Sequence, residues 1–389
     1  MLKKTLLAIA LGSLAAGSVC AADVTVYGLV DYGFAYEKID QGNEALDSET
    51  FKMNSGMNSS SRFGFKGTED IGNGLKVGFV LENGFNADDG TLGNGGRLFG
   101  REAQLYLTSD FGTLSFGRVG SLMSANGTFG LLGKFSPFIG GWGNHTGGRH
   151  FHVADWGRMD NTITYASPNL AGLQAFIQYS FQQDTKEVHN NGTAVENKSS
   201  ADRIGNIALT YGIGGLNLIA LAQWNQWSNL DRNGTAPGWR EHKNGHNFLL
   251  GATYDFNVAK LYATGEYNKH MRIKASDNKT ITGASGSFSN WIQNTGYADG
   301  HAVTLGADVP AFGGTFKTEL GYRYGECVVN AANDYKQYGI GLGYTYDLSK
   351  RTTVYTAGSY VKADLGKPHQ GADDTNHAYE LMAGMIHRF

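Results

Sequence analysis

Hydrophobic and polar residues alternate with a period of two along much of the chain beyond residue 22. In these segments every second position is apolar and the positions between are polar or small, which is typical of β-strands with one apolar face. The clearest segments are residues 24–34, 62–66, 75–82, 173–182, 247–256 and 316–324. The alternation is weak over residues 216–227 and 352–361, where strands are expected from their place in the series.

Two kinds of connection separate the expected strands, and they alternate strictly along the chain. Short connections rich in turn-forming residues fall at 70–74, 110–112, 168–172, 212–215, 255–257, 310–314 and 347–350. Long polar connections fall at about 37–60, 87–97, 119–158, 183–200, 228–245, 271–297, 327–334 and 365–376. Seven short and eight long connections join sixteen strands and leave both chain ends on the side of the short turns.

This organisation predicts an all-β protein, a sixteen-stranded antiparallel transmembrane β-barrel with long extracellular loops and short periplasmic turns. A soluble β-sandwich also has alternating strands, but its domains have about 100 residues and need no regular alternation of long and short connections. No apolar run beyond residue 22 approaches the roughly 20 residues of a transmembrane helix.

The first 22 residues have the layout of a secretory signal peptide. Lys3 and Lys4 precede an apolar run over residues 6–14, and small residues follow. We expect cleavage after residue 22 or, nearly as well, after residue 21. Residues 1–22 are then removed, and residues 23–389 form one barrel domain in the outer membrane.

Composition and charge narrow the class of protein further. The chain has 56 Gly, 20 Tyr and 21 Phe but only 5 Pro, which suits tight turns and interfacial aromatic girdles. After removal of Lys3 and Lys4, 30 of the 32 Lys and Arg remain against 35 Asp and Glu, so the mature net charge is −5. This acidic balance argues against a nucleic-acid partner.

Neither cysteine indicates a covalent link. Cys20 could suggest a lipid anchor, but Val19 is too bulky for the residue that precedes a lipid-modified cysteine. Cleavage then leaves Cys327 alone, so no internal disulfide is expected.

The chain ends in a strand whose last residue is aromatic. One face of this strand would carry Tyr379, Leu381, Ala383, Met385, His387 and Phe389. Such an ending resembles the segment that the barrel-assembly machinery of Gram-negative bacteria recognises. We therefore expect Phe389 to act as an assembly signal, and the folded barrel to contact outer-membrane lipid and lipopolysaccharide.

Several segments carry motifs beyond strand periodicity. They are VTVYGLVDYG at 24–33, SRFGFKGTEDIGNGL at 61–75, LENGF at 81–85, LFGREA at 98–103, DFGTLSFGR at 110–118, NTITYASP at 161–168 and HRF at 387–389. As a set they resemble the Gram-negative general porins of the Neisseria and Comamonas type. The resemblance implies a homotrimer of sixteen-stranded barrels, each with its third loop folded inward to narrow a water-filled pore for small hydrophilic solutes and ions.

The third long connection, about residues 119–157, is the longest and contains many aromatic residues: Phe129, Phe135, Phe138, Trp142, Phe151 and Trp156. A loop of this length without secondary structure is functional or disordered, and its aromatic content favours inward packing. Its one carboxylate is Asp155, against Lys134 and Arg149.

The resemblance places three wall arginines opposite this loop. Arg62 shares a polar face with Lys66, and Arg158 shares one with Asp160, so these side chains are expected in the lumen. By strict alternation Arg101 falls on an apolar face and reaches the pore only through a bulge or near the rim. The candidate constriction residues are Arg62, Arg101, Arg158, Lys66, Asp155 and Asp160. Because the loop has one carboxylate, we expect a weak preference for anions.

Other chemistry has little support. His145, His150 and His152 lack an acid or cysteine that would complete a metal site, so neither a metal nor another cofactor is expected. The GIGLG sequence at 339–343 lies mid-strand with no helix after it, and is interpreted as a small-residue barrel face. No HExxH, GxSxG or Walker sequence supports an outer-membrane enzyme. A general diffusion pore is favoured, and the alternative is a substrate-selective channel.

Overall fold

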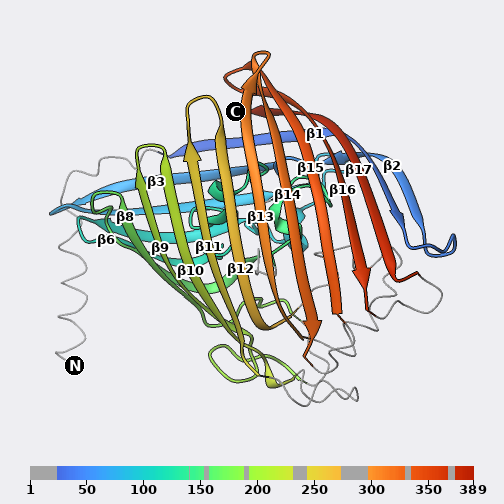
Figure 1. Ribbon diagram of the computed structural model, residues 1–389. Helices are drawn as coiled ribbons and strands as arrows, with labels where there is room; N and C mark the ends of the chain where they lie inside the picture. Colours follow the sequence, from blue (N-terminus) through green and yellow to red (C-terminus); the bar gives the residue numbers. More distant parts are fainter. Residues whose placement is uncertain are drawn as a thin grey trace, which may run out of the picture.

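The strands of this protein pair in chain order to form one closed antiparallel barrel (Figure 1). The computed structural model describes residues 24–139, 141–152, 157–187, 192–230, 243–272, 297–328, 334–366 and 373–389. The last strand pairs with the first over Leu29–Asp40, so the barrel has no open edge. In a membrane this closure satisfies the backbone N–H and C=O groups that lipid cannot.

The strands are β1 (Thr25–Asp40), β2 (Ser48–Ser55), β3 (Arg62–Gly72), β4 (Leu75–Gly84), β5 (Glu102–Ser109), β6 (Gly112–Gly120), β7 (Arg158–Ala166), β8 (Leu173–Ser180), β9 (Arg203–Ile213), β10 (Leu216–Gln226), β11 (Gly245–Asp255), β12 (Lys260–Arg272), β13 (Tyr297–Ala311), β14 (Gly314–Cys327), β15 (Asp334–Ser349), β16 (Thr352–Leu365) and β17 (Thr375–Arg388). Three short helical segments lie in loops: α2 (Gly93–Gly96), η1 (Leu132–Phe135) and η2 (Gly148–His150). None of the described helices is long and apolar enough to cross a membrane.

These seventeen segments make sixteen barrel strands, because β2 and β3 occupy successive parts of one position. Residues 32–39 of β1 pair with β2, and residues 25–29 pair with β3. The predicted sixteen-stranded barrel is therefore confirmed.

The first long connection was predicted over residues 37–60, and this is wrong in its extent. β1 continues to Asp40, and β2 fills residues 48–55, so only residues 41–47 connect them. Polar residues conceal the strand, but Phe51 and Met53 alternate with Thr50 and Lys52 and face outward. The backbone hydrogen bonds of a hairpin with β1 are satisfied there regardless of side-chain polarity.

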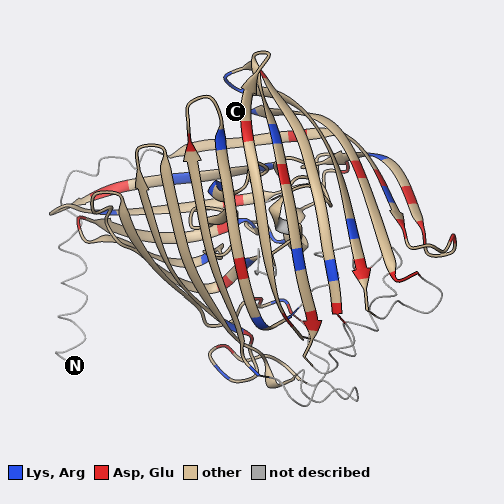
Figure 2. Cartoon of the chain, in the orientation of Figure 1, with Lys and Arg blue, Asp and Glu red and all other residues tan. Residues whose placement is uncertain are grey.

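The two faces of the wall have the polarity of a membrane barrel and not of a soluble protein. On the outside, Leu250 and Leu342 expose 67% and 57% of their surface, whereas inward-facing Asn247 and Gln337 are fully buried. Figure 2 shows that β9, β10 and β11 carry few charged residues. This arrangement excludes a β-sandwich, whose buried face would be apolar.

The predicted signal peptide, residues 1–22, lies outside the described residues.

Candidate functional site

The connection between β6 and β7, residues 121–157 and hereafter the third loop, folds into the barrel as predicted (Figure 1). Its first half packs against strands β7 to β11 in an apolar cluster inside the lumen. The cluster consists of Val119, Leu122, Met123, Phe129, Leu131, Leu132 and Phe135 with Ala166, Phe176, Ala208, Ile219, Leu221 and Leu249.

Glycines in the wall make room for the aromatic side chains of the loop. A Cβ at Gly321 would lie 2.2 Å from the Phe151 ring, and one at Gly343 would lie 2.8 Å from the Phe138 ring. Gly339 and Gly341 face the same two rings. The small-residue face predicted at 339–343 is thus the surface against which the loop packs.

Wall carboxylates fix the loop by accepting its hydrogen bonds. Glu102 accepts from Thr128 N at 2.7 Å, and Glu319 accepts from Ser136 Oγ at 2.9 Å. Glu380 accepts from the backbone N of Asn144 and of His145 at 2.8 and 2.9 Å.

The loop histidines also lie beside wall carboxylates. His152 Nδ1 lies 3.0 Å from Glu266 Oε2, and His145 Nε2 lies 3.4 Å from Glu37 Oε2. No group of three or more potential metal ligands occurs among the described residues. His145 and His152 thus add contacts between the third loop and the wall.

Between β2 and β3 the wall breaks, and residues 56–61 connect the two strands inside the barrel. The carboxylate of Asp31 on β1 is fully buried and accepts hydrogen bonds from Asn58 N at 2.8 Å, Ser59 N at 2.6 Å and Tyr355 Oη at 2.6 Å. Met57 in turn accepts a hydrogen bond from Gly143 N of the third loop at 2.7 Å. Asp31 thus links the wall to the loop tip through the strand break.

Replacing Asp31 with alanine is expected to destabilise the barrel. The buried hydroxyl of Tyr355 would lose its acceptor, at about 1–3 kcal/mol, and two part-buried backbone N–H groups would lose theirs at a smaller cost. The measurement is the temperature at which the folded band is lost on a heat-modification gel, with Asp110→Ala in an exposed turn as the control. Equal transition temperatures for the two variants would contradict the anchoring role of Asp31.

A cavity of about 630 Å³ lies between the third loop and the wall formed by β1, β3, β4, the start of β5 and the end of β17. We call it the chamber. Its wall carries Arg62, Arg101, Arg388, Glu82 and Glu102. The loop side consists of Ala125, Asn126, Gly127, Thr128, Ile139, Gly141 and Gly143, none of which is charged.

Hydrogen bonds to the strand break and to Glu82 orient the chamber arginines. Arg62 donates to Ser59 Oγ at 3.1 Å, and its Nε lies 3.9 Å from Glu82 Oε2. Arg101 Nε lies 2.7 Å from Glu82 Oε1. Arg101 was expected to reach the lumen only through a bulge or near the rim. It lines the chamber because it directly precedes β5, where the alternation of strand faces does not apply.

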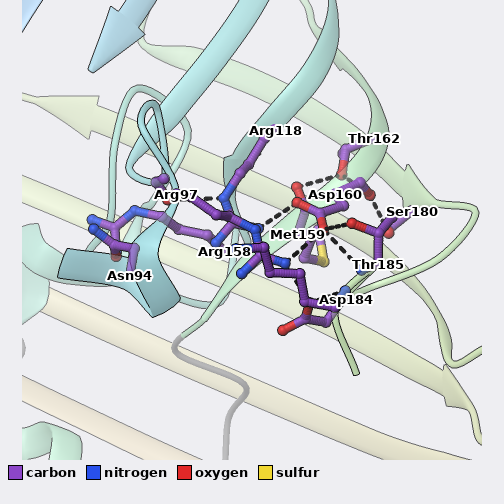
Figure 3. Close-up of polar contacts among 12 residues, drawn as sticks. Asn94, Arg97, Arg118, Arg158, Met159, Asp160, Thr162, Ser180, Asp184 and Thr185 are labelled. Carbon is purple, nitrogen blue, oxygen red and sulfur yellow. Dashed lines mark hydrogen bonds and ion pairs between the residues drawn. The ribbon is translucent and has the colours of Figure 1, made fainter. Parts of the chain in front are cut away.

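The arginine cluster continues next to the chamber around Asp160 (Figure 3). Asp160 pairs with Arg97 at 3.3 Å and with Arg118, and it also accepts from Thr185 N at 2.9 Å. Arg158 donates from Nε to the Arg101 backbone O at 2.8 Å. The carboxylate of Asp160 therefore neutralises part of the positive charge of Arg97 and Arg118.

Not every predicted site residue lines the chamber. Arg62 and Arg101 do so, whereas Arg158 and Asp160 form the neighbouring cluster. Lys66 is exposed, and its Nζ lies 5.2 Å from the centre of the Tyr27 ring. Asp155 lies outside the described residues.

Sequence reasoning missed Glu82, Glu102 and Arg388 as chamber residues. Arg388 reaches the chamber because the last strand pairs with the first, which brings it opposite Leu29. The HRF ending identified a barrel terminus but did not indicate a pore residue.

Taken together, the fold and site define a channel: a closed membrane barrel whose lumen is narrowed by an inward loop. The chain belongs to the Gram-negative porin family, whose model matches residues 5–366. It is 32% identical to an outer membrane porin protein of Bordetella pertussis over 93% of this chain and 94% of that protein. It is an outer-membrane channel and not an enzyme.

Solved porins have the same architecture. The anion-selective porin from Comamonas acidovorans matches with a TM-score of 0.66 at 23% identity, covering 95% of this chain and 100% of that one. The trimer form of OmpT from Vibrio cholerae matches with a TM-score of 0.61 at 14% identity, again over 95% of this chain and 100% of that one.

Proposed function

We propose that this protein is a general diffusion porin that passes small hydrophilic solutes and ions passively and weakly prefers anions. The observation that carries the proposal is the one-sided charge of the chamber, with three arginines on the wall and no charged residue on the described loop side. A pore selects among ions by the electrostatic field at its narrowest part.

The carboxylates of the chamber offset this positive field only in part. Glu82 pairs with Arg101 and accepts a hydrogen bond from Tyr27 Oη at 3.0 Å. Glu102 is directed to the loop through Thr128. The solved neighbour from Comamonas acidovorans is described as anion-selective, which agrees with the proposal.

Replacing Arg62 with alanine is expected to shift the zero-current potential in a KCl gradient toward cations. A few-fold change in permeability ratio corresponds to about 1 kcal/mol, which is reasonable for one partly exposed charge in a wet pore. The shift should decrease at high salt because the screening length falls to about 3 Å at 1 M. Planar-bilayer recordings measure both effects.

The control is Arg351→Ala, in the exposed turn between β15 and β16. If Arg351→Ala shifts the potential at low salt and Arg62→Ala does not, Arg62 is not at the constriction. Saturable block of the wild-type current by one solute would favour the substrate-selective alternative.

We also propose that three copies assemble into a homotrimer. A trimer form is recorded for the OmpT neighbour. On the outer face of β1 and β2, exposed Phe34 and Phe51 stack with ring centres 5.9 Å apart, and such a pair suits an apolar interface. Native mass spectrometry from detergent distinguishes a trimer from a monomer.

A further inference from the structure

Ile139 is an exception within its part of the third loop. Its neighbours Phe135, Phe138 and Trp142 are buried against the wall, with at most 3% of their surface exposed. Ile139 instead exposes 58% of its surface and lines the chamber. A large apolar side chain thus faces the water-filled part of the pore.

The backbone at Ile139 adopts a conformation that such a residue avoids. Its φ is +52°, and it is the one β-branched residue with positive φ in the described part of the chain. A β-branched residue at positive φ is a true outlier and persists only where the surroundings impose it.

The surroundings of Ile139 do impose this conformation. Ile139 N donates to Ser136 O at 3.2 Å, and Ser136 Oγ donates to Glu319 of β14. On the other side Gly141 N donates to Phe138 O at 3.0 Å, and Phe138 is fully buried. The turn is fixed at both ends, and its side chain is held toward the pore.

A solute in the chamber therefore meets two different surfaces. The wall carries the guanidinium groups of three arginines, Arg62, Arg101 and Arg388, with the carboxylates of Glu82 and Glu102 between them in the lining. The loop side has small residues, and Ile139 is its bulkiest. Hydrocarbon offers no hydrogen bonds to replace waters that an ion loses. Guanidinium groups are themselves weakly hydrated.

We propose that Ile139 sets the width of the constriction and makes it discriminate among anions by their hydration, an inference that rests on the proposed anion preference. A weakly hydrated anion such as iodide gives up water readily and passes between Arg62 and Ile139. A strongly hydrated anion keeps its water shell and is retarded. In a pore without this apolar side, iodide and chloride would pass at similar rates.

The test is the iodide-to-chloride permeability ratio, from bi-ionic potentials with potassium as the common cation. Ile139→Asn keeps the number of side-chain heavy atoms, and asparagine tolerates positive φ. It should lower the ratio by about two- to threefold while changing the KCl conductance little, as expected for loss of one apolar side chain. Ile139→Gly should lower the ratio and also raise the conductance.

The matched control is Ile71→Asn, at an exposed isoleucine near the periplasmic end of β3 and outside the chamber, which should leave both quantities unchanged. An unchanged ratio in both Ile139 variants, or an equal fall in Ile71→Asn, would overturn the inference. The proposed anion preference is tested separately by the wild-type zero-current potential in KCl. A cation-selective wild type would refute that preference whatever the Ile139 variants do to conductance.

Discussion

Deleting Phe389 is expected to abolish assembly of the barrel, leaving unfolded protein in the periplasm. Phe389 N donates to Gly28 O, and Gly28 N donates to Phe389 O, both at 3.1 Å. These bonds extend the pairing of β17 with β1 that closes the sheet. A shortened last strand would lose both bonds and the aromatic end that we expect the assembly machinery to recognise. A chain that is not recognised would not be closed into a barrel, and its open edge is not tolerated in lipid.

Two further variants separate the effect of the Phe389 ring from that of its two backbone hydrogen bonds. Phe389→Tyr keeps both and should assemble normally, whereas Phe389→Ala keeps only the backbone bonds. The ring packs so closely on Gly28 that a Cβ there would lie 2.5 Å from it. The yield of heat-modifiable barrel in outer-membrane fractions is the measurement, and a wild-type yield after the deletion would refute the role of Phe389.

Replacing Phe138 with alanine is expected to detach the tip of the third loop while leaving the barrel closed. Phe138 is fully buried, packs on the Gly341 and Gly343 wall, and contacts Trp142 with ring centres 5.2 Å apart. Truncating a buried phenylalanine costs about 3–5 kcal/mol, which exceeds the contribution of any single hydrogen bond at the tip. Single channels should then show a larger and noisier conductance.

Limited proteolysis provides a second measurement, since a detached loop should be cleaved where the wild-type loop is resistant. The control is Phe111→Ala, because Phe111 exposes 85% of its surface in the turn between β5 and β6. If Phe138→Ala retains the wild-type conductance and protease resistance, the loop is held mainly by its polar anchors.

Most of the strands could be predicted because apolar and polar residues alternate along their own sequence. Outward positions such as Leu250 and Leu342 are apolar, and inward ones such as Asn247 are polar. This period-two pattern needs no knowledge of distant contacts. β2 was missed since its polar residues resemble a loop, and its partner strand β1 supplies the evidence only in three dimensions.

The chamber was predicted less completely. Arg62 was found from the resemblance to general porins and from the polar face that it shares with Lys66, and the single carboxylate of the loop could be counted. Arg388 joins the chamber only when the barrel closes. The use of Glu319 and Glu380 as loop anchors depends on pairings between distant parts of the chain, which no local pattern reveals.

The wall glycines beneath the aromatic rings of the third loop limit which loops this barrel can accept. Phe151 fits because residue 321 has no side chain, and a larger residue there would occupy the same space. Loop and wall must therefore change together, so a third loop grafted from another barrel should seat only if its bulky residues meet matching gaps. The pore-lining loop and the wall that receives it thus form one unit in any exchange between barrels.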